Sequence, residues 1–429
     1  MAETKQTKAP EVQTNAPDFH LMVIEILAWA AGLATLLFLL RVPLLEGAST
    51  FRHDNIMWGY PIFQFFADHV AHDRLPFWNP YSHGGEPFYM PLSHTQNYQP
   101  LRLLITWMGS HWTSDGLLLF NWNRVLQNLV MVFGAYLTLR RFCNSWMARV
   151  SLVPVLLFSS TMLGSFQQDA RADQFLWAPY VAYFLISIVY FGRDHWREWL
   201  LLSAVLGLNY FTYFFVGIWL FVGFFLLGFT LFQRDLLTAV IRRPHFLRKL
   251  GVLLAVQLTM MAPVWALWRS SSDLTFPART IAAVGEPTRA VLDYATLTKT
   301  GAFSRPMDFA AMLWPSRGDL PAAQWADWGG TSSEAFLYLG LWPWALGLLG
   351  LCVGSHELKR VWAFTTGAFF LLMLGPAGGL IASLAAGVLL RWPGVVTAGV
   401  AMTLAMGAEL GALGRNWRRG RDRLAGATA

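Results

Sequence analysis

The sequence is poor in charged side chains and in cysteine. Only 13% of its 429 residues are charged, whereas 55% are hydrophobic. A soluble domain of this composition would expose large apolar patches and aggregate, which excludes the soluble classes. The two cysteines, Cys143 and Cys352, imply no disulfide framework. The composition therefore predicts a polytopic membrane protein.

Several motifs of catalysis are also absent from the sequence. It contains no phosphate-binding Gly-Lys loop, no Gly-x-Ser-x-Gly turn, no zinc-ligand spacing and no haem attachment pattern. The glycine pairs of the last apolar segments are typical of helix packing. No catalytic class is therefore indicated by a local motif alone.

Long apolar runs are what the sequence has in place of charge. About 20 apolar residues cross a hydrocarbon core of about 30 Å as a helix. The run at 199–232 is too long for one crossing and is interrupted by “GLNYFTY”, which predicts two short helices joined by a tight turn. Small residues and a final proline at 375–393 favour an interfacial or re-entrant helix. The sequence thus predicts an all-α fold with about ten transmembrane helices, at 21–45, 117–139, 147–163, 175–191, 199–232 (two), 250–268, 335–354, 361–374 and 395–413.

Basic residues determine the expected orientation. Most of the 32 lysines and arginines, but few of the 25 acidic residues, fall on the same side as the N-terminus. The positive-inside rule then predicts that both termini are cytoplasmic. The net charge of +7 reflects this topology, which argues against nucleic acid as a partner. We expect a disordered cytoplasmic tail at 1–19, a single transmembrane domain at 20–414 and a basic cytoplasmic tail at 415–429.

Two long loops are expected on the outer face, at 46–116 and 269–334. Both exceed what a turn between adjacent helices needs. The first contains “FRHDNIMWGYPIFQFFADHVAHDRLPFWNPYSHGGEPF” at 51–88, where ionisable side chains are concentrated among aromatic and turn residues. Two long loops on one side of a bundle can form a cap over a cavity, which favours this face as the place for chemistry.

The order of segments along the chain resembles a known membrane family. In the first outer loop, Asp54 is followed by “YPIFQFFADHV”, “LPFWNPYSHGGEPF” and “TQNYQPLRLL”. Later segments are “FLWAPYVAYFL” at 175–185, “SSEAFLYLGLWPWALGLLGL” at 332–351 and “LLRWPGVVTAGVAMTLAMGAELG” at 389–411. Together they resemble YfhO-like membrane proteins of the GT-C glycosyltransferase superfamily, of which this chain would be a shortened relative.

The resemblance implies a glycosyltransferase that uses a polyprenyl-phosphate sugar on the outer face of the bacterial cytoplasmic (inner) membrane. Asp54 then matches the acid that acts on the acceptor or binds a divalent metal ion. Arginines are the candidate phosphate ligands, because a guanidinium donates paired hydrogen bonds and keeps its charge. The candidate substrate and phosphate ligands are Arg52, His83, Glu86, Arg102, Arg171 and Arg391.

Each candidate also has a structural interpretation. A lone aspartate beside a helix end commonly caps the helix or forms a salt bridge. An arginine at the membrane interface commonly reaches toward lipid headgroups. “WNPYSHGGEPF” is first a turn signature, in which Trp78, Tyr81 and Phe88 are expected to anchor the loop at headgroup level. The functional roles and these structural ones are both open from the sequence.

Other ionisable residues also have two interpretations. The aspartates and histidines of “ADHVAHD” at 67–73 are spaced for metal ligands on one helix face, but such a face is more often solvated. Glu25 and Glu409 lie within apolar runs, where a charge facing lipid costs several kcal/mol. We therefore expect each of these two glutamates to face the bundle or to reach water from near a helix end.

Two features depart from the enzyme pattern. The first outer loop has no Asp-x-Asp or adjacent-acid motif, and the chain stops after the helix that follows Arg391. The alternative is a non-catalytic GT-C-like accessory or scaffold subunit of a larger membrane complex, with Trp and Phe side chains contacting other subunits. A transporter would need an inverted repeat and mid-span charges, which the sequence does not show by eye. The enzyme predicts Asp54 at a lateral opening, near an arginine that binds phosphate.

Overall fold

The computed structural model describes residues 19–47, 49, 59–81, 86–88, 96–143, 145–158, 176–212, 216–271, 356 and 358–373. The chain divides into two units, Met1–Phe276 and Pro277–Ala429. The fold is mostly helical, as predicted. The first unit contains α1 (Phe19–Leu39), the π-helix η1 (Val42–Glu46), α2 (Tyr60–Val70), β1 (Trp78–Asn79), β2 (Glu86–Pro87), η3 (Gln96–Tyr98), α4 (Pro100–Ser110), α5 (Gly116–Arg140), α6 (Trp146–Leu157), α9 (Ala178–Val189), α10 (Trp196–Leu208), η4 (Asn209–Phe211), α11 (Val216–Phe232), α12 (Arg234–Ile241) and α13 (Phe246–Ser271), and the second contains α18 (Lys359–Met373).

The structure does not confirm ten membrane spans. Within the described residues, α1 and the Phe246–Ala266 part of α13 are long and apolar enough to cross a membrane, and the bent pair α11–α12 would make a third. Helices occupy the predicted spans at 117–139, 147–163 and 175–191, but α6 and α9 are short and α5 is rich in polar residues. The predictions at 335–354, 375–393 and 395–413 lie outside the described residues. Two such helices indicate a membrane-associated protein.

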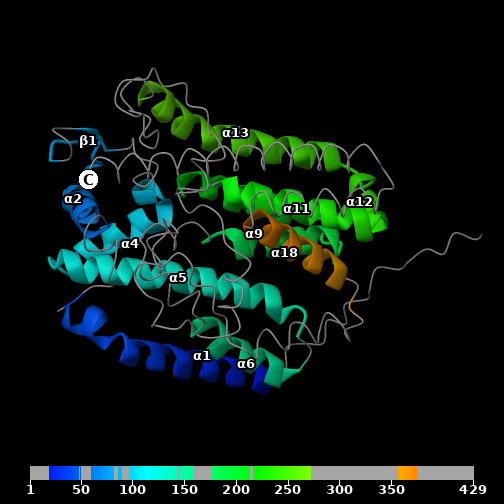
Figure 1. Cartoon of the computed structure of the whole chain (residues 1–429), viewed down its shortest axis with the longest axis horizontal. Helices are drawn as coiled ribbons and strands as arrows, with labels where there is room; N and C mark the ends of the chain where they lie inside the picture. The colour runs from blue at the N-terminus through cyan, green and yellow to red at the C-terminus, as the bar shows by residue number, and fades with distance from the viewer. Residues whose placement is uncertain are drawn as a thin grey trace, which may run out of the picture. The chain divides into compact units, whose positions relative to one another are not determined.

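The described helices of the first unit pack side by side. α5 contacts α4, α6 and α9, while α1 packs on α6 and α10 packs on both α9 and α13. Figure 1 shows α2, α4 and β1 at one end of this unit and α12 at the other. The run at 199–232 forms two helices, α10 and α11, separated by η4, as “GLNYFTY” predicts. The helix connections therefore gather at the two ends of the unit.

Two apolar clusters hold the first unit together. The first lies between α1, η1, α5 and α6, and the second joins α2 to the start of α5. Full burial of a large apolar side chain stabilises a fold by about 1.5–3 kcal/mol, so each cluster is a substantial source of cohesion. The buried members are Leu36, Leu44, Val125, Val132, Tyr136, Val153 and Leu157 in the first, and Phe63, Phe66, Ala67, Val70, Phe88, Leu119 and Phe120 in the second.

The segment predicted as the first outer loop contains an amphipathic helix, α2. In α2, Phe63, Phe66, Ala67 and Val70 recur at helical spacing and are all buried, and Pro61 occupies the first turn, where no intrahelical donor is needed. α2 contacts both α4 and α5. α2 and α4 thus pack together on α5, with α2 contacting its N-terminal part.

Candidate functional site

Among the predicted site residues, only Arg102 has its side chain described. It lies in α4 and is 1% exposed. Glu86 belongs to β2, where its backbone pairs with Asn79 of β1. The other predicted site residues lie outside the described residues: Asp54, Arg52, His83, Arg171 and Arg391. Their catalytic, metal-binding and phosphate-binding roles stay predictions.

The turn signature at 78–88 contains a short antiparallel hairpin. The Asn79 side chain accepts a hydrogen bond from the Tyr81 backbone N–H at 3.0 Å, which stabilises the turn after β1. Tyr81 is 87% and Trp78 54% exposed, so both remain candidates for the headgroup level. Phe88 is fully buried and stacks on Phe66. The prediction that Phe88 anchors the loop at headgroups is wrong, because this ring covers the apolar face of α2.

The “ADHVAHD” segment forms the solvated end of α2. Asp68, His72 and Asp73 are exposed. The Nδ1 atoms of His69 and His72 lie 2.8 and 2.7 Å from the carbonyl oxygens four residues earlier. Asp73 accepts a hydrogen bond from Trp107 Nε1 at 3.0 Å, which fastens the end of α2 to α4. In the described part of the chain, no group of three His, Cys, Asp or Glu side chains is placed to hold a metal ion.

A layer of buried polar side chains lies between η3, α4 and α5. We call it the polar layer. Each member is at most 1% exposed: Asn97, Gln99, Arg102, Thr106, Asn123, Arg124 and Gln127. Burying polar groups costs free energy unless they bond to one another or to a ligand. This layer therefore needs a physical explanation in a chain that is otherwise so apolar.

Hydrogen bonds connect the polar layer from α4 to α5. Thr106 Oγ1 donates to the Arg102 carbonyl oxygen at 2.7 Å. Asn123 Nδ2 donates to the same carbonyl at 3.2 Å and to Thr106 Oγ1 at 2.8 Å. Gln127 Nε2 in turn donates to Asn123 Oδ1 at 2.5 Å. Part of the layer thus satisfies itself and fixes α4 against α5.

Other polar atoms of the layer are left over at the start of α4. Gln99 is the N-cap, and its Oε1 accepts the Arg102 backbone N–H at 2.6 Å. Gln99 Nε2 and both side-chain amide atoms of Asn97 are buried with no hydrogen-bond partner among the described residues. The guanidinium carbon of Arg102 lies 5.2 Å from the centre of the Phe63 ring, which covers it on one side. The Arg102 guanidinium and the side-chain amides of Gln99 and Asn97 are therefore close in the sequence and buried. Such a set of donors could bind an anion that carries several oxygen atoms.

The chain that follows α1 is fixed on α5 next to the polar layer. Asn121 Nδ2 donates to the carbonyl oxygens of Pro43 and Ser49, each at 2.9 Å. Trp122 Nε1 donates to a further carbonyl of η1 at 2.9 Å. The segment that contains Asp54 begins directly after this attachment. The polar layer and the start of the predicted catalytic loop therefore share one end of α5.

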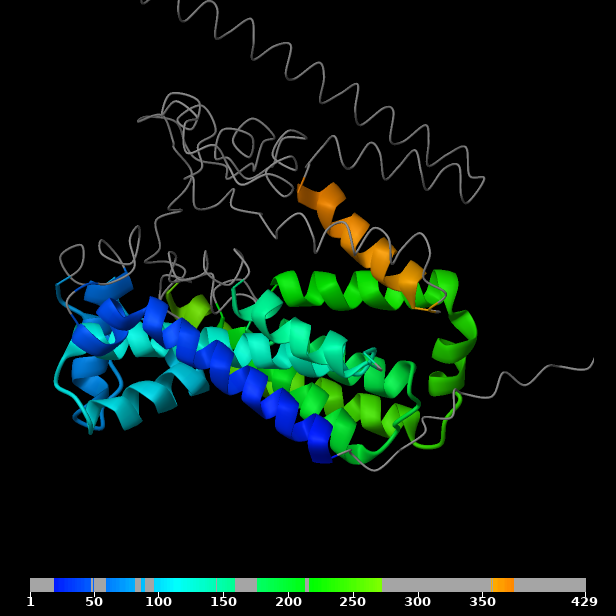
Figure 2. The ribbon, with the colours of Figure 1, turned by 90° about the horizontal axis from the view of Figure 1, so that it is seen from below.

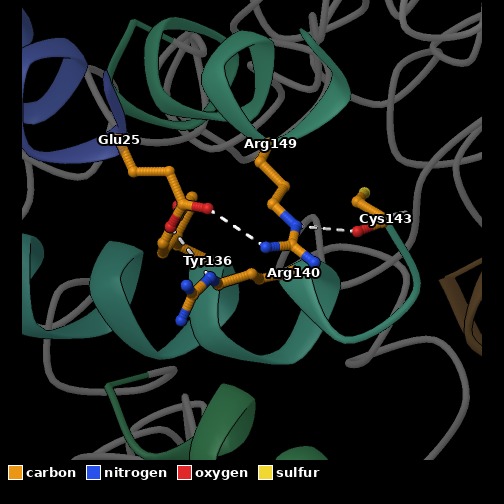
Figure 3. Close-up of polar contacts among 5 residues, drawn as sticks. All are labelled: Glu25, Tyr136, Arg140, Cys143 and Arg149. Carbon is orange, nitrogen blue, oxygen red and sulfur yellow. Dashed lines mark hydrogen bonds and ion pairs between the residues drawn. The ribbon is translucent and has the colours of Figure 1, made fainter. Parts of the chain in front are cut away.

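A carboxylate cluster joins α1, α5 and α6 near the opposite end of α5. Glu25 is 6% exposed, and its Oε2 accepts the Tyr136 hydroxyl at 2.8 Å and lies 2.9 Å from Arg140 Nε. Glu25 Oε1 lies 3.3 Å from Arg149 Nη1. Figure 3 shows the carboxylate pointing toward the two guanidinium groups, with Arg149 also donating to the Cys143 carbonyl oxygen. The prediction that Glu25 faces the bundle is confirmed.

An ion pair also joins the α9–α10 connection to α13. Asp194 Oδ2 lies 2.7 Å from Lys249 Nζ, and Trp199 Nε1 donates to Asp194 Oδ1 at 2.8 Å. Burial by itself would raise the pKa of Asp194, but the hydrogen bonds from Lys249 and Trp199 and the positive charge of Lys249 outweigh it. The pKa is lowered from its usual value of 3.8. The charged form of this side chain is therefore the form that the fold stabilises.

We expect Asp194 to make stability depend on acid. Because its folded-state pKa is lower than the unfolded-state value of 3.8, its contribution is present above that value and is lost as the pH falls through the folded-state pKa. Asp194→Asn should lower the thermal midpoint at neutral pH and approach the wild type in acid. The measurement is the thermal midpoint in detergent, followed from neutral pH down to below the unfolded-state pKa of 3.8. Asp235→Asn, at an exposed position, is the control. Parallel pH profiles for Asp194→Asn and wild type would contradict the assignment.

The polar layer is the strongest candidate site in the described chain. It combines burial, positive charge and spare hydrogen-bonding atoms, whereas the Glu25 and Asp194 clusters are satisfied internally. The chain matches no protein-family profile, no curated protein and no solved structure.

Proposed function

We propose that the chain is a membrane glycosyltransferase-like protein that transfers a sugar from a polyprenyl-phosphate donor on the outer face of the cytoplasmic membrane. The observation that supports it is the polar layer, in which Arg102 and the spare amides of Gln99 and Asn97 form a buried set of donors. A phosphate or pyrophosphate headgroup offers several oxygens to such a set. The resemblance of the first outer loop to GT-C enzymes supplies the rest of the proposal.

The distribution of charge supports the proposed orientation. Asn123 in the polar layer and Arg140 beside Glu25 are about 25 Å apart along α5, at roughly 1.5 Å per residue. That separation approaches the thickness of a hydrocarbon core. The cationic side chains of Arg140, Arg149 and Lys249 lie at the end of the helices away from the polar layer. By the positive-inside rule this end is cytoplasmic, and the polar layer then faces the outer leaflet.

The proposed division of labour follows from these positions. Arg102, assisted by Gln99 and Asn97, would hold the lipid phosphate and fix the sugar near the outer face. Asp54, which follows the segment attached to α5, would act on the acceptor hydroxyl or bind a divalent metal ion. A carboxylate suits either task, because it can accept a proton or donate oxygen ligands.

The lipid that copurifies with the chain tests this proposal. We expect native-lipid preparations of the full chain to retain a polyprenyl phosphate, detected by mass spectrometry. Arg102→Gln should reduce its amount on the order of tenfold or more, since a hydrogen bond to a charged group contributes about 1.5–3 kcal/mol. Arg102→Lys should retain part of it, and Arg74→Gln, an exposed arginine between α2 and β1, should retain all of it.

A different outcome would favour the accessory subunit. Exposed apolar side chains on α13, including Leu254, Leu258 and Trp265, suit contact with lipid or with helices of other subunits. If Asp54→Asn leaves glycoconjugates unchanged, no polyprenyl phosphate copurifies, and a stable complex of membrane subunits does, the scaffold function replaces the transferase.

A further inference from the structure

The junction between α11 and α13 presents a surface that none of the sites above uses. α11 and α12 are bent by 109° at Gln233, and α12 is only eight residues long. Figure 2 shows α12 turning away from the line of α11 before the chain returns along α13. Because α12 runs across the helices on which it packs, it cannot continue either of them through a membrane.

One face of α12 packs against the rest of the first unit. Val240 is 3% exposed, and Leu236 and Leu237 are half-buried, while α12 contacts α9 and α11. Arg243, just after the helix, is held by a hydrogen bond from Nη1 to the Ile188 carbonyl oxygen at 3.3 Å. These contacts fix how the other face of the junction is presented.

The other face combines exposed apolar and basic side chains. Leu231, Phe232, Ile241 and Leu247 are 40–79% exposed. Arg234, Arg242 and Arg248, in the same short stretch of the chain, are also exposed, and none of the three forms an ion pair with a described carboxylate. Five basic residues and one acidic residue lie between 231 and 249. We call the four apolar and three basic side chains the junction face.

From this combination we infer that the junction face lies in the interface of the membrane and binds the phosphate headgroups of anionic phospholipids. Apolar side chains beside arginines match a short helix that lies in the membrane plane, with the apolar groups at the acyl boundary and the guanidinium groups at the phosphates. The positive charge complements an anionic leaflet. A nucleic acid would satisfy the arginines but would leave Leu247, at 79% exposure, in water.

Lipid preference of the full chain tests the inference. In reconstituted vesicles of phosphatidylcholine containing phosphatidylglycerol, we expect spin-labelled phosphatidylglycerol to associate more tightly than spin-labelled phosphatidylcholine. Arg242→Gln combined with Arg248→Gln should weaken the phosphatidylglycerol association at the junction by roughly fivefold for each arginine. The preference should also fall at high salt. An Arg41→Gln and Arg74→Gln pair removes the same charge from exposed positions elsewhere and should leave most of the preference.

A label on the junction face separates a lipid surface from a protein partner. Ile241→Cys, in a chain whose two native cysteines are replaced by serine, carries a spin label at a position that is 52% exposed. We expect the label to collide with membrane-dissolved oxygen more than with a water-soluble nickel chelate. A label protected from both reagents would show a protein contact there and overturn the inference. An unchanged lipid preference in the Arg242 and Arg248 pair, or an equal loss in the control pair, would also overturn it.

Discussion

Glu25→Gln is expected to loosen the bundle where α1, α5 and α6 meet. The substitution keeps the size of the side chain but leaves Arg140 and Arg149 without the buried carboxylate that both contact. Removing one member of a buried ion pair costs about 3–5 kcal/mol. Because the two arginine side chains are 37% and 26% exposed, water replaces part of the loss, and we expect about 2–3 kcal/mol. Thermal unfolding in detergent measures it.

The Glu25 prediction has a matched control. Glu46→Gln changes the same group at an exposed position at the end of η1 and should leave the thermal midpoint unchanged. Tyr136→Phe removes only the hydrogen bond to Glu25 and should have a smaller effect, about 1 kcal/mol. Equal midpoints for Glu25→Gln and Glu46→Gln would show that the cluster does not stabilise the bundle.

Gly134→Ala is expected to destabilise the contact between α5 and α9. A Cβ at this position would lie 2.5 Å from Tyr180 Cε2, well inside van der Waals contact. The Tyr180 ring cannot swing away freely, because its hydroxyl donates to the Val130 carbonyl oxygen at 2.7 Å. Overpacking of this kind costs about 1–3 kcal/mol. The measurement is the thermal midpoint, together with the near-UV circular dichroism of the packed aromatic rings.

A glycine-to-alanine substitution where the new methyl group meets no other atom should change stability in the opposite direction. Gly223 lies in α11, and a Cβ there would meet nothing within 4 Å. Gly223→Ala should therefore stabilise the protein by up to about 1 kcal/mol, because alanine is the better helix former. If Gly134→Ala also stabilises the protein, helix propensity outweighs packing at both positions, and the close approach of α5 and α9 is not tight.

Local sequence predicts the helices well, because an apolar run can be identified without knowing which other segments it packs against. “GLNYFTY” predicts the break between α10 and α11, and the buried spacing of α2 follows from its aromatic residues. The partners of Glu25 could not be predicted in this way. They lie more than a hundred residues away along the chain, and only the packing of α1 against α5 and α6 brings them to the carboxylate.

The polar layer could have been predicted from the spacing of polar residues, which a mean hydropathy does not show. The run at 117–139 is apolar on average, and the sequence predicts an ordinary span there. Within it, “NWNRVLQN” at 121–128 places polar residues three or four apart, which indicates one helix face turned to the bundle interior. All of Asn121, Asn123, Arg124, Gln127 and Asn128 are buried. Spacing, rather than mean hydropathy, would have predicted this part of the candidate site.

For Arg102, the resemblance to GT-C enzymes and the structure give different kinds of support for phosphate binding. The prediction of a phosphate ligand rests on its place in the first outer loop, whereas the structure adds burial, the Phe63 ring and the spare amides of Gln99 and Asn97. None of these could be predicted from the position of an arginine in a sequence. An interfacial arginine that reaches toward headgroups would be exposed, and Arg102 is 1% exposed, so that alternative is wrong for this residue.

The most direct test of the account is an experimental structure of the full chain in native lipid. We predict phosphate density within hydrogen-bonding distance of Gln99 Nε2 and the Arg102 guanidinium, continuous with an acyl or prenyl chain that leaves between helices. A polar layer filled only by water or by the chain's own side chains, with every lipid phosphate outside it, would contradict the account.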